Sequence, residues 1–269
     1  MKRDNQNDVC EFVREIVAAR LQEPIALVGR PDQKRRDIKA VDELWESATR
    51  RFAVEHTLIE SFPGQLANIE TIKRILVPVK ERLAGHLPGR FALAVTAADT
   101  AAARVNFAVA HREIERLILE KAGQLAVGET VTLASELVPF TMRLHLRFKG
   151  DSRLILYSDI EGDADQLRVD RLHVALDSKC PKLALWAKDG RTSILILEAD
   201  DSQHSNAAHV IQATRTAIGE RNDPPDVIVL VETDASPWSG WVLKEGAQFG
   251  DDVAPKSTKG YMYERGRVS

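Results

Sequence analysis

Two stretches organise the fold of this chain: Ala40-Val-Asp-Glu-Leu-Trp-Glu46 and Arg51-Phe-Ala-Val-Glu-His-Thr-Leu-Ile-Glu60. Each is an apolar run typical of a buried strand, and each contains a carboxylate, Asp42 in the first and Glu55 in the second. A buried carboxylate must be neutral, paired or bound to a cation, because an isolated buried charge is too unfavourable. If the two runs form neighbouring strands, we expect the two carboxylates to make a site for a hard metal ion.

The second run is rich in residues that favour strands, and alternation assigns its side chains to two faces. Glu55 and Thr57 then share one face with Ala53, whereas His56 falls on the apolar face with Phe52, Val54 and Leu58. A histidine on an apolar face is typically a hydrogen-bonded core residue, so we expect His56 to be structural.

Patterns along the rest of the chain predict an α/β protein. Helical spacing of apolar residues indicates helices at 9–21, 66–83, 99–122, 165–188 and 204–218, and apolar runs indicate buried strands at 91–95, 194–197 and 226–231, with a last short strand at 241–244. Strand–helix–strand units at 52–95 and 194–231 favour a mixed, mostly parallel central sheet flanked by helices.

The middle of the chain has a different pattern. Strands expected at 129–136, 140–148 and 153–159 suggest an antiparallel meander, because apolar and polar side chains alternate there as in a sheet with one wet face. We therefore expect a single α/β domain over 1–269, with an antiparallel β insertion at 124–162 and a loosely ordered tail at 248–269.

Composition narrows the functional classes. The chain has 269 residues, a net charge of −3 and a pI near 6.2, which argues against strong non-specific nucleic-acid binding but not against a local basic patch. Cys10 and Cys180 are far apart, which suggests reduced thiols and a cytoplasmic location. No apolar run approaches the roughly 20 residues of a membrane-spanning helix.

The order of elements resembles the core of the PD-(D/E)xK, or restriction-endonuclease-like, nuclease superfamily, over roughly residues 9–96. That order is a helix, short strands, a strand with a central acidic residue, then a helix and another strand. The resemblance implies that Asp42 and Glu55 hold one or two Mg²⁺ (or Mn²⁺) ions, with Glu11 or Glu15 from the first helix completing the cluster. Such a metal polarises the scissile phosphate and helps to form hydroxide.

The lysine of this motif is missing from its usual place, where the chain has Thr57 in Glu55-His56-Thr57. The resemblance then implies a displaced lysine, for which Lys39 and Lys73 are the candidates. A later segment, Asp177-Ser-Lys-Cys-Pro-Lys-Leu-Ala-Leu-Trp-Ala-Lys188, is similar to the lysine-bearing helix of some members. Its Lys179 and Lys182 could face substrate phosphates.

Structural interpretations compete with each of these assignments. Glu55 could belong to an ion pair with Arg50, Arg51 or a lysine from a helix, and Asp42 could cap a helix. The basic run at 30–39 could bind phosphate or could be solvated surface. Acidic residues after the strand at 194–197 could be turn residues or could line a ligand site at the carboxyl end of the sheet.

These observations support three functional hypotheses. The first is a metal-dependent nuclease that hydrolyses phosphodiester bonds in DNA or RNA. The second is a non-catalytic interaction protein that keeps the nuclease-like fold. The third is a small-ligand-binding α/β protein that uses the acidic strand ends at Glu198 and Glu232. No membrane partner is expected, and the chain could form a homodimer.

Overall fold

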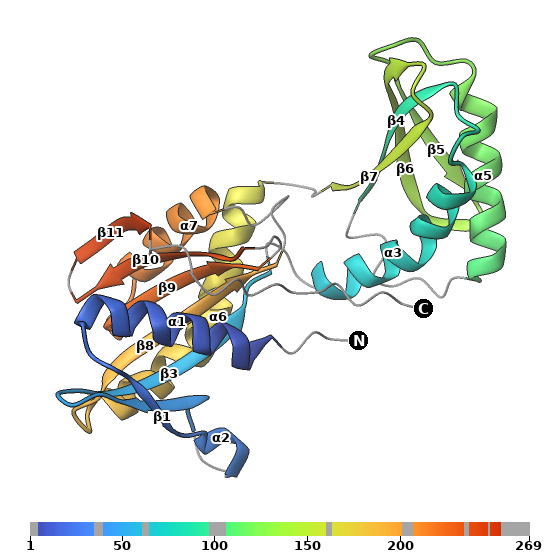
Figure 1. The fold of residues 1–269 in the computed structure, drawn as a ribbon. Helices are drawn as coiled ribbons and strands as arrows, with labels where there is room; N and C mark the ends of the chain where they lie inside the picture. The colour runs from blue at the N-terminus through green and yellow to red at the C-terminus, as the bar shows by residue number, and fades with distance from the viewer. Residues whose placement is uncertain are drawn as a thin grey trace. The chain divides into compact units, whose positions relative to one another are not determined.

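The structure of the chain is a computed structural model that describes residues 5–34, 40–60, 65–96, 106–159, 163–200, 207–233, 237–246 and 248–253. The chain divides into two compact units (Figure 1). Unit 1 comprises Met1–Ser61 and Asp165–Ser269, and unit 2 comprises Phe62–Ala164. Unit 2 is therefore inserted into the sequence of unit 1.

Unit 1 contains a seven-stranded mixed sheet in the order β1-β2-β3-β8-β9-β10-β11. β3 (Arg51–Leu58), β8 (Thr192–Ala199) and β9 (Val227–Glu232) run parallel to one another. The outer pairings are antiparallel and involve β1 (Ala26–Gly29), β2 (Glu43–Glu46), β10 (Ser239–Glu245) and β11 (Gln248–Val253). The expected mixed sheet is confirmed, but "mostly parallel" was wrong, because only the three central strands are parallel.

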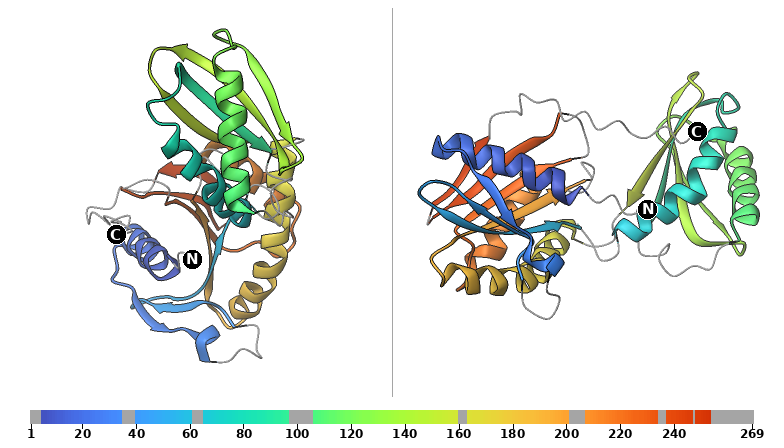
Figure 2. Two further views of the ribbon diagram at one scale, coloured as in Figure 1. Left: turned by 90° about the vertical axis from the view of Figure 1, so that its right-hand side faces the viewer. Right: turned by 60° about the horizontal axis from the view of Figure 1, so that its bottom comes forward.

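Helices cover both faces of this sheet (Figure 2). On one face, α1 (Gln6–Leu21) packs Phe12 and Ile16 against strand residues such as Val54 and Ile196. On the other face, α6 (Ala164–Ala187) and α7 (Ala207–Gly219) pack against strand residues that include Ala53, Leu195, Leu197, Ile228 and Leu230. A short helix, α2 (Pro31–Lys34), precedes β2. The central strands are thus buried on both sides, which explains their near-continuous apolar sequences.

Unit 2 is a four-stranded sheet, β5-β6-β4-β7, with two helices packed on one face. The helices are α3 (Gln65–Arg82) and α5 (Phe107–Ala122), and the strands are β4 (Gly89–Thr96), β5 (Thr130–Ser135), β6 (Val138–Lys149) and β7 (Arg153–Asp159). The predicted strands are present, but the simple meander was wrong. β4 lies between β6 and β7 and pairs with β7 in parallel.

The division into units also differs from the expected organisation. β4 belongs to the sheet of unit 2, so 52–95 is not a strand–helix–strand unit of one sheet. The strands expected as an insertion at 124–162 share their core with α3, β4 and α5, which begin far earlier in the chain. Residues 248–253 of the expected loose tail form β11, and 254–269 lie outside the described residues.

Within the described ranges, none of the helices combines the length and apolar character that crossing a bilayer would require.

Candidate functional site

Strand register brings Asp42 and Glu55 together. β2 and β3 are antiparallel, and Glu43 pairs with Val54. One further step along this register places Asp42 opposite Glu55, and opposite residues of an antiparallel pair project from the same face. That face carries Ala53 and packs against α6. The Asp42 carboxylate is fixed there, because its Oδ2 accepts a hydrogen bond of 2.7 Å from the His56 backbone N–H.

Two lysines of α6 meet these carboxylates. The Lys179 ammonium group donates to Glu55 Oε2 and lies 3.7 Å from Asp42 Oδ2. Lys182 Nζ lies 3.4 Å from Glu55 Oε1. The two lysines are three residues apart, so they project from the same side of the helix. We refer to Asp42, Glu55, Lys179 and Lys182 as the carboxylate–lysine cluster.

Burial sets the electrostatics of this cluster. The Glu55 side chain is fully buried, and its pKa is raised by burial and by the nearby Asp42 charge, which the two lysines oppose. Burial by itself lowers the pKa of Lys179, but the Asp42 and Glu55 carboxylates outweigh it and raise the pKa overall. Lys179 is therefore held as a cation, and the cluster still favours additional positive charge near Glu55.

A second polar network lies on the opposite face of the same sheet, toward the carboxyl ends of β3 and β8. Glu198 on β8 is buried, and its Oε2 lies 2.8 Å from His56 Nε2. Its Oε1 accepts hydrogen bonds from Thr233 Oγ1 at 2.8 Å and from Asn5 Nδ2 at 3.3 Å. Burial raises the pKa of Glu198, but the hydrogen bond and charge of His56, with the other two donors, lower it overall. His56 is hydrogen-bonded in the core, as its position on the apolar face predicts.

His56 joins the two networks. Its backbone N–H holds Asp42, while its imidazole holds Glu198 on the other face of the sheet. The position of the Asp42 carboxylate is thereby tied to the buried network around Glu198.

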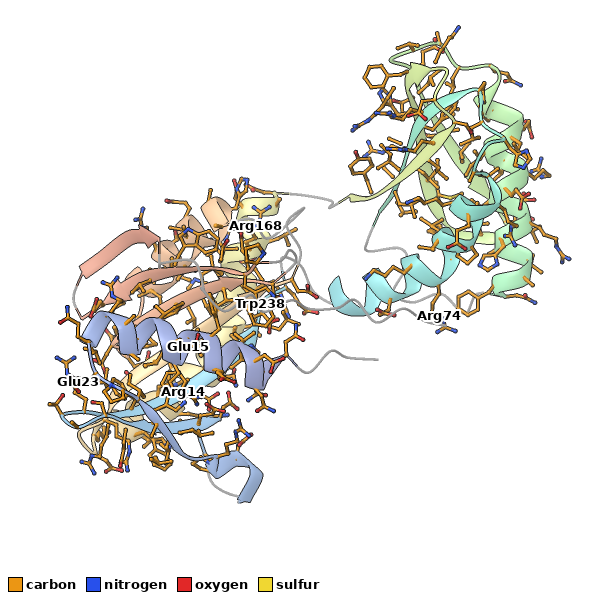
Figure 3. The ribbon with its side chains drawn as sticks, viewed as in Figure 1. Arg14, Glu15, Glu23, Arg74, Arg168 and Trp238 are labelled. Carbon is orange, nitrogen blue, oxygen red and sulfur yellow. The ribbon has the colours of Figure 1, made fainter. Side chains whose placement is uncertain are left out.

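Among the described residues of unit 1, the remaining acidic candidates are not brought to this cluster. Lys39 lies outside the described residues. Lys73 lies on α3 of unit 2 and is exposed. Glu15 lies on α1 (Figure 3), which packs against the sheet face opposite Glu55, and Glu11 is on the same helix. Among the described residues, no group of three or more His, Cys, Asp or Glu side chains is placed to hold one metal ion.

Structural roles account for several other acidic and basic residues. Glu232 Oε1 accepts a hydrogen bond of 2.6 Å from the backbone N–H of Ala207, the first residue of α7. Arg30, at the start of the basic run, forms an ion pair of 2.8 Å with the buried Glu43. Glu232 therefore contacts the start of α7, and Arg30 pairs with the buried Glu43.

A hollow of about 530 Å³ lies at the other end of the strands. It is lined by residues that include Arg50, Arg191, Thr192 and Asp226, at the amino ends of β8 and β9. Open α/β sheets bind ligands at the carboxyl ends of their strands. We therefore place the candidate site at the carboxylate–lysine cluster and not at this hollow.

No protein-family model, curated protein or solved structure matches the chain. The function is therefore inferred from the geometry of the cluster.

An ion pair between Glu55 and a lysine from a helix is one of the alternatives that the sequence leaves open, and the structure shows this pair with Lys179 and Lys182. The sequence pattern does not predict that Lys179 also approaches Asp42. A signal for a carboxylate partner of Lys179 exists in the sequence. The buried residues of α6 include Leu172, Leu176, Cys180 and Leu183, and Lys179 lies at the edge of this stripe, next to Cys180. A lysine beside an apolar stripe favours a carboxylate partner, and Glu55 is that partner.

Proposed function

We propose that the chain is a metal-dependent nuclease with a restriction-endonuclease-like core, which hydrolyses phosphodiester bonds in DNA or RNA. The observation that carries this proposal is the fully buried carboxylate of Glu55, placed beside a second carboxylate and two lysines on one face of the sheet. A buried glutamate whose pKa is raised by burial and by a second carboxylate is an arrangement that occurs at functional sites.

The order of elements supports the same proposal. Once the inserted unit 2 is set aside, unit 1 has the order α1, β1, α2, β2, β3, α6 and β8, so α6 and β8 take the places that the resemblance gave to the helix and strand at 66–83 and 91–95, which belong to unit 2. The resemblance expects a lysine near Glu55, and Thr57 cannot supply its charge. Lys179 supplies a positive charge to the same face from α6.

The donor set fits Mg²⁺ or Mn²⁺. These ions bind through one or two carboxylates and complete their shell with water and substrate phosphate, and Asp42 with Glu55 offers such a pair. When bound, the ion would polarise the phosphate and lower the pKa of a water molecule. The His56 N–H orients Asp42, and Lys179 keeps its proton beside the carboxylates. Lys182, the more exposed of the two lysines, would bind a phosphate oxygen.

One observation favours the non-catalytic alternative. Lys179 and Lys182 already neutralise Glu55 without any metal, as they would in a protein that keeps the fold for interaction alone. Metal-dependent cleavage separates the two functions, because only the nuclease requires a divalent cation.

The decisive experiment measures cleavage of single- and double-stranded DNA and RNA with Mg²⁺, Mn²⁺ or EDTA. We expect cleavage with metal only, and a loss of roughly a hundredfold or more in Asp42→Asn, Glu55→Gln and Lys179→Met, the scale for losing one preorganised charged group. Two control variants make the same types of substitution away from the cluster. Glu245→Gln changes a surface ion pair with Arg20, and Lys188→Met changes an exposed lysine after α6.

The controls should cleave at the wild-type rate. Metal-independent cleavage, or equal rates in Glu55→Gln and Glu245→Gln, would contradict the proposal. An inactive wild-type chain whose thermal stability does not respond to metal would favour the non-catalytic alternative.

A further inference from the structure

One face of the sheet in unit 2 is not covered by the two described helices, α3 and α5. On the central strand β4, Phe91, Leu93 and Val95 pack against α3 and α5. Alternation directs Ala92 and Ala94 to the other side, which we call the open face. Strand register adds neighbours to the open face: His145 and Arg143 from β6, and Ile155 and Tyr157 from β7.

Basic residues outnumber acidic residues on the strands of this unit. The strands β4 to β7 carry one acidic residue, Asp159, and five basic residues: Arg90, Arg143, Arg147, Lys149 and Arg153. Asp151, in the turn between β6 and β7, is paired with Arg90. α5, by contrast, balances its basic residues with Glu113, Glu115 and Glu120. The strands therefore provide a local basic surface in a chain whose net charge is −3.

Aromatic rings lie among these arginines. The Arg147 guanidinium carbon is 5.1 Å from the centroid of the Tyr157 ring. These residues come from β6 and β7, which flank β4, so the side chains meet across the central strand above its small alanines. An irregularity in the β4–β6 pairing lets Phe148 pair with Arg90, which alternates with the alanines of β4 onto the open face. Phe148 is 58% exposed, and the Arg90 guanidinium carbon is 5.8 Å from its ring centroid.

Exposed aromatic rings and arginines on a sheet form a stacking surface for unpaired bases. Bases of a single strand stack on aromatic side chains and on guanidinium planes, while its phosphates are neutralised by nearby cations. A duplex keeps its bases stacked inside, so it would reach only the charges of such a face. Aromatic residues and arginines are also enriched at protein interfaces, so it is the excess of basic over acidic residues on these strands that favours a polyanion as the ligand.

We infer that the open face of unit 2 binds single-stranded nucleic acid, with Arg147 and Arg153 on phosphates and with Tyr157 and Phe148 stacked on bases. This inference rests on unit 2 alone. It holds whether or not the carboxylate–lysine cluster of unit 1 cleaves phosphodiesters, and it is tested without metal.

The test measures fluorescence anisotropy of labelled 15-nucleotide dT and rU strands, and of a 15-base-pair duplex, with the full chain in EDTA. Both single strands should bind more tightly than the duplex. The double variant Arg147→Gln/Arg153→Gln should bind more weakly and reduce the slope of log K against log salt by about 1.4, since each lost contact to a single strand removes about 0.7. Phe148→Ser should weaken binding about fivefold or more, and Tyr157→Leu should do the same.

A matched control removes two charges from the helices of the same unit, in Arg112→Gln/Lys80→Gln, where both side chains are exposed. It should keep the wild-type slope. Circular dichroism and thermal melting verify folding, and Phe148→Ser keeps the test valid if Tyr157→Leu unfolds. The inference is overturned if the wild type does not bind single strands, if it prefers the duplex, or if the open-face variants match the control. A preference of either dT or rU would identify which single strand is the ligand.

Discussion

Glu55 and Lys179 are 124 positions apart in the chain, yet the lysine ammonium contacts a carboxylate that is closed to solvent. The two partners respond to each other unequally. The pKa of Glu55 is raised despite the lysines, whereas the pKa of Lys179 is raised by the carboxylates. The folded structure therefore holds the lysine charge firmly and disfavours the glutamate charge.

Glu55→Gln and Lys179→Met should have opposite effects on the free energy of unfolding at pH 7. A raised pKa means that the folded state disfavours the Glu55 charge, so the neutral glutamine should leave stability unchanged or higher. Removing Lys179 leaves Glu55 beside Asp42 with Lys182 alone, and we expect a loss of up to roughly 3 kcal/mol. Urea unfolding measures both.

The same asymmetry predicts a pH dependence. The difference in the free energy of unfolding between wild type and Glu55→Gln should shrink as the pH falls toward 4.5. Protonation of a group whose pKa is raised in the folded state favours that state. If Glu55→Gln is the less stable variant at pH 7, the assignment of the shift is wrong.

Divalent metal should raise the melting temperature of the wild type through Asp42 and Glu55. Binding to the folded state alone stabilises it, and protons compete with the metal for a carboxylate whose pKa is raised. We expect a larger increase with Mn²⁺ at pH 7.5 than at pH 5.5. Differential scanning fluorimetry should show no increase in Asp42→Asn, while Glu245→Gln behaves as the wild type.

The Glu198→Gln variant should lose less stability than the wild type as the pH falls. The pKa of Glu198 is lowered in the folded state. Its contribution to the free energy of unfolding is therefore present above the ordinary pKa of 4.5 and is lost as the pH falls through the lowered pKa. The partners facing its carboxylate are His56, Thr233 and Asn5. Urea unfolding of both proteins from pH 7 to pH 3 makes the comparison. Parallel curves would show that Glu198 does not carry the acid sensitivity.

Gly89→Ala should destabilise unit 2, whereas Gly123→Ala should not. A Cβ at position 89 would lie 2.4 Å from the Phe148 carbonyl oxygen, which belongs to the paired strand and cannot move aside. Overpacking of this kind costs roughly 1–3 kcal/mol. A Cβ at position 123 meets no atom within 4 Å. Thermal melting of the two variants decides, and equal melting temperatures would contradict the close approach of β6 to β4.

Neither cysteine should react with Ellman's reagent at pH 8 in the folded protein. Burial raises the pKa of the Cys180 thiol to about 11 and also strongly raises the pKa of the Cys10 thiol. The reactive thiolate is therefore scarce at both positions at pH 8. Both thiols should react fully in guanidinium chloride. Rapid labelling of native protein would show that α1 or α6 is packed less tightly than the structure has it.

Local sequence predicted most of the elements, because the periodicity of apolar residues is a short-range property. The meeting of Asp42 with Glu55 was expected only if their two runs form neighbouring strands, and the pairing of β2 with β3 meets this condition. Partners that are distant in sequence were harder. Nothing near 153–159 shows that β7 pairs with β4 and not with β6, since strand order depends on the whole sheet. The sequence leaves open a helix lysine as the partner of Glu55 but does not identify Lys179, because only the assembled fold carries α6 over β3.

The insertion of unit 2 also orders events during synthesis. Glu55 leaves the ribosome long before Lys179, and β3 has no parallel neighbour until β8 has been translated. The nascent chain therefore carries Asp42 and Glu55 without their lysines while all of unit 2 is made. The completed carboxylate–lysine cluster exists only in chains translated beyond α6, so a truncated product ending within unit 2 cannot assemble it.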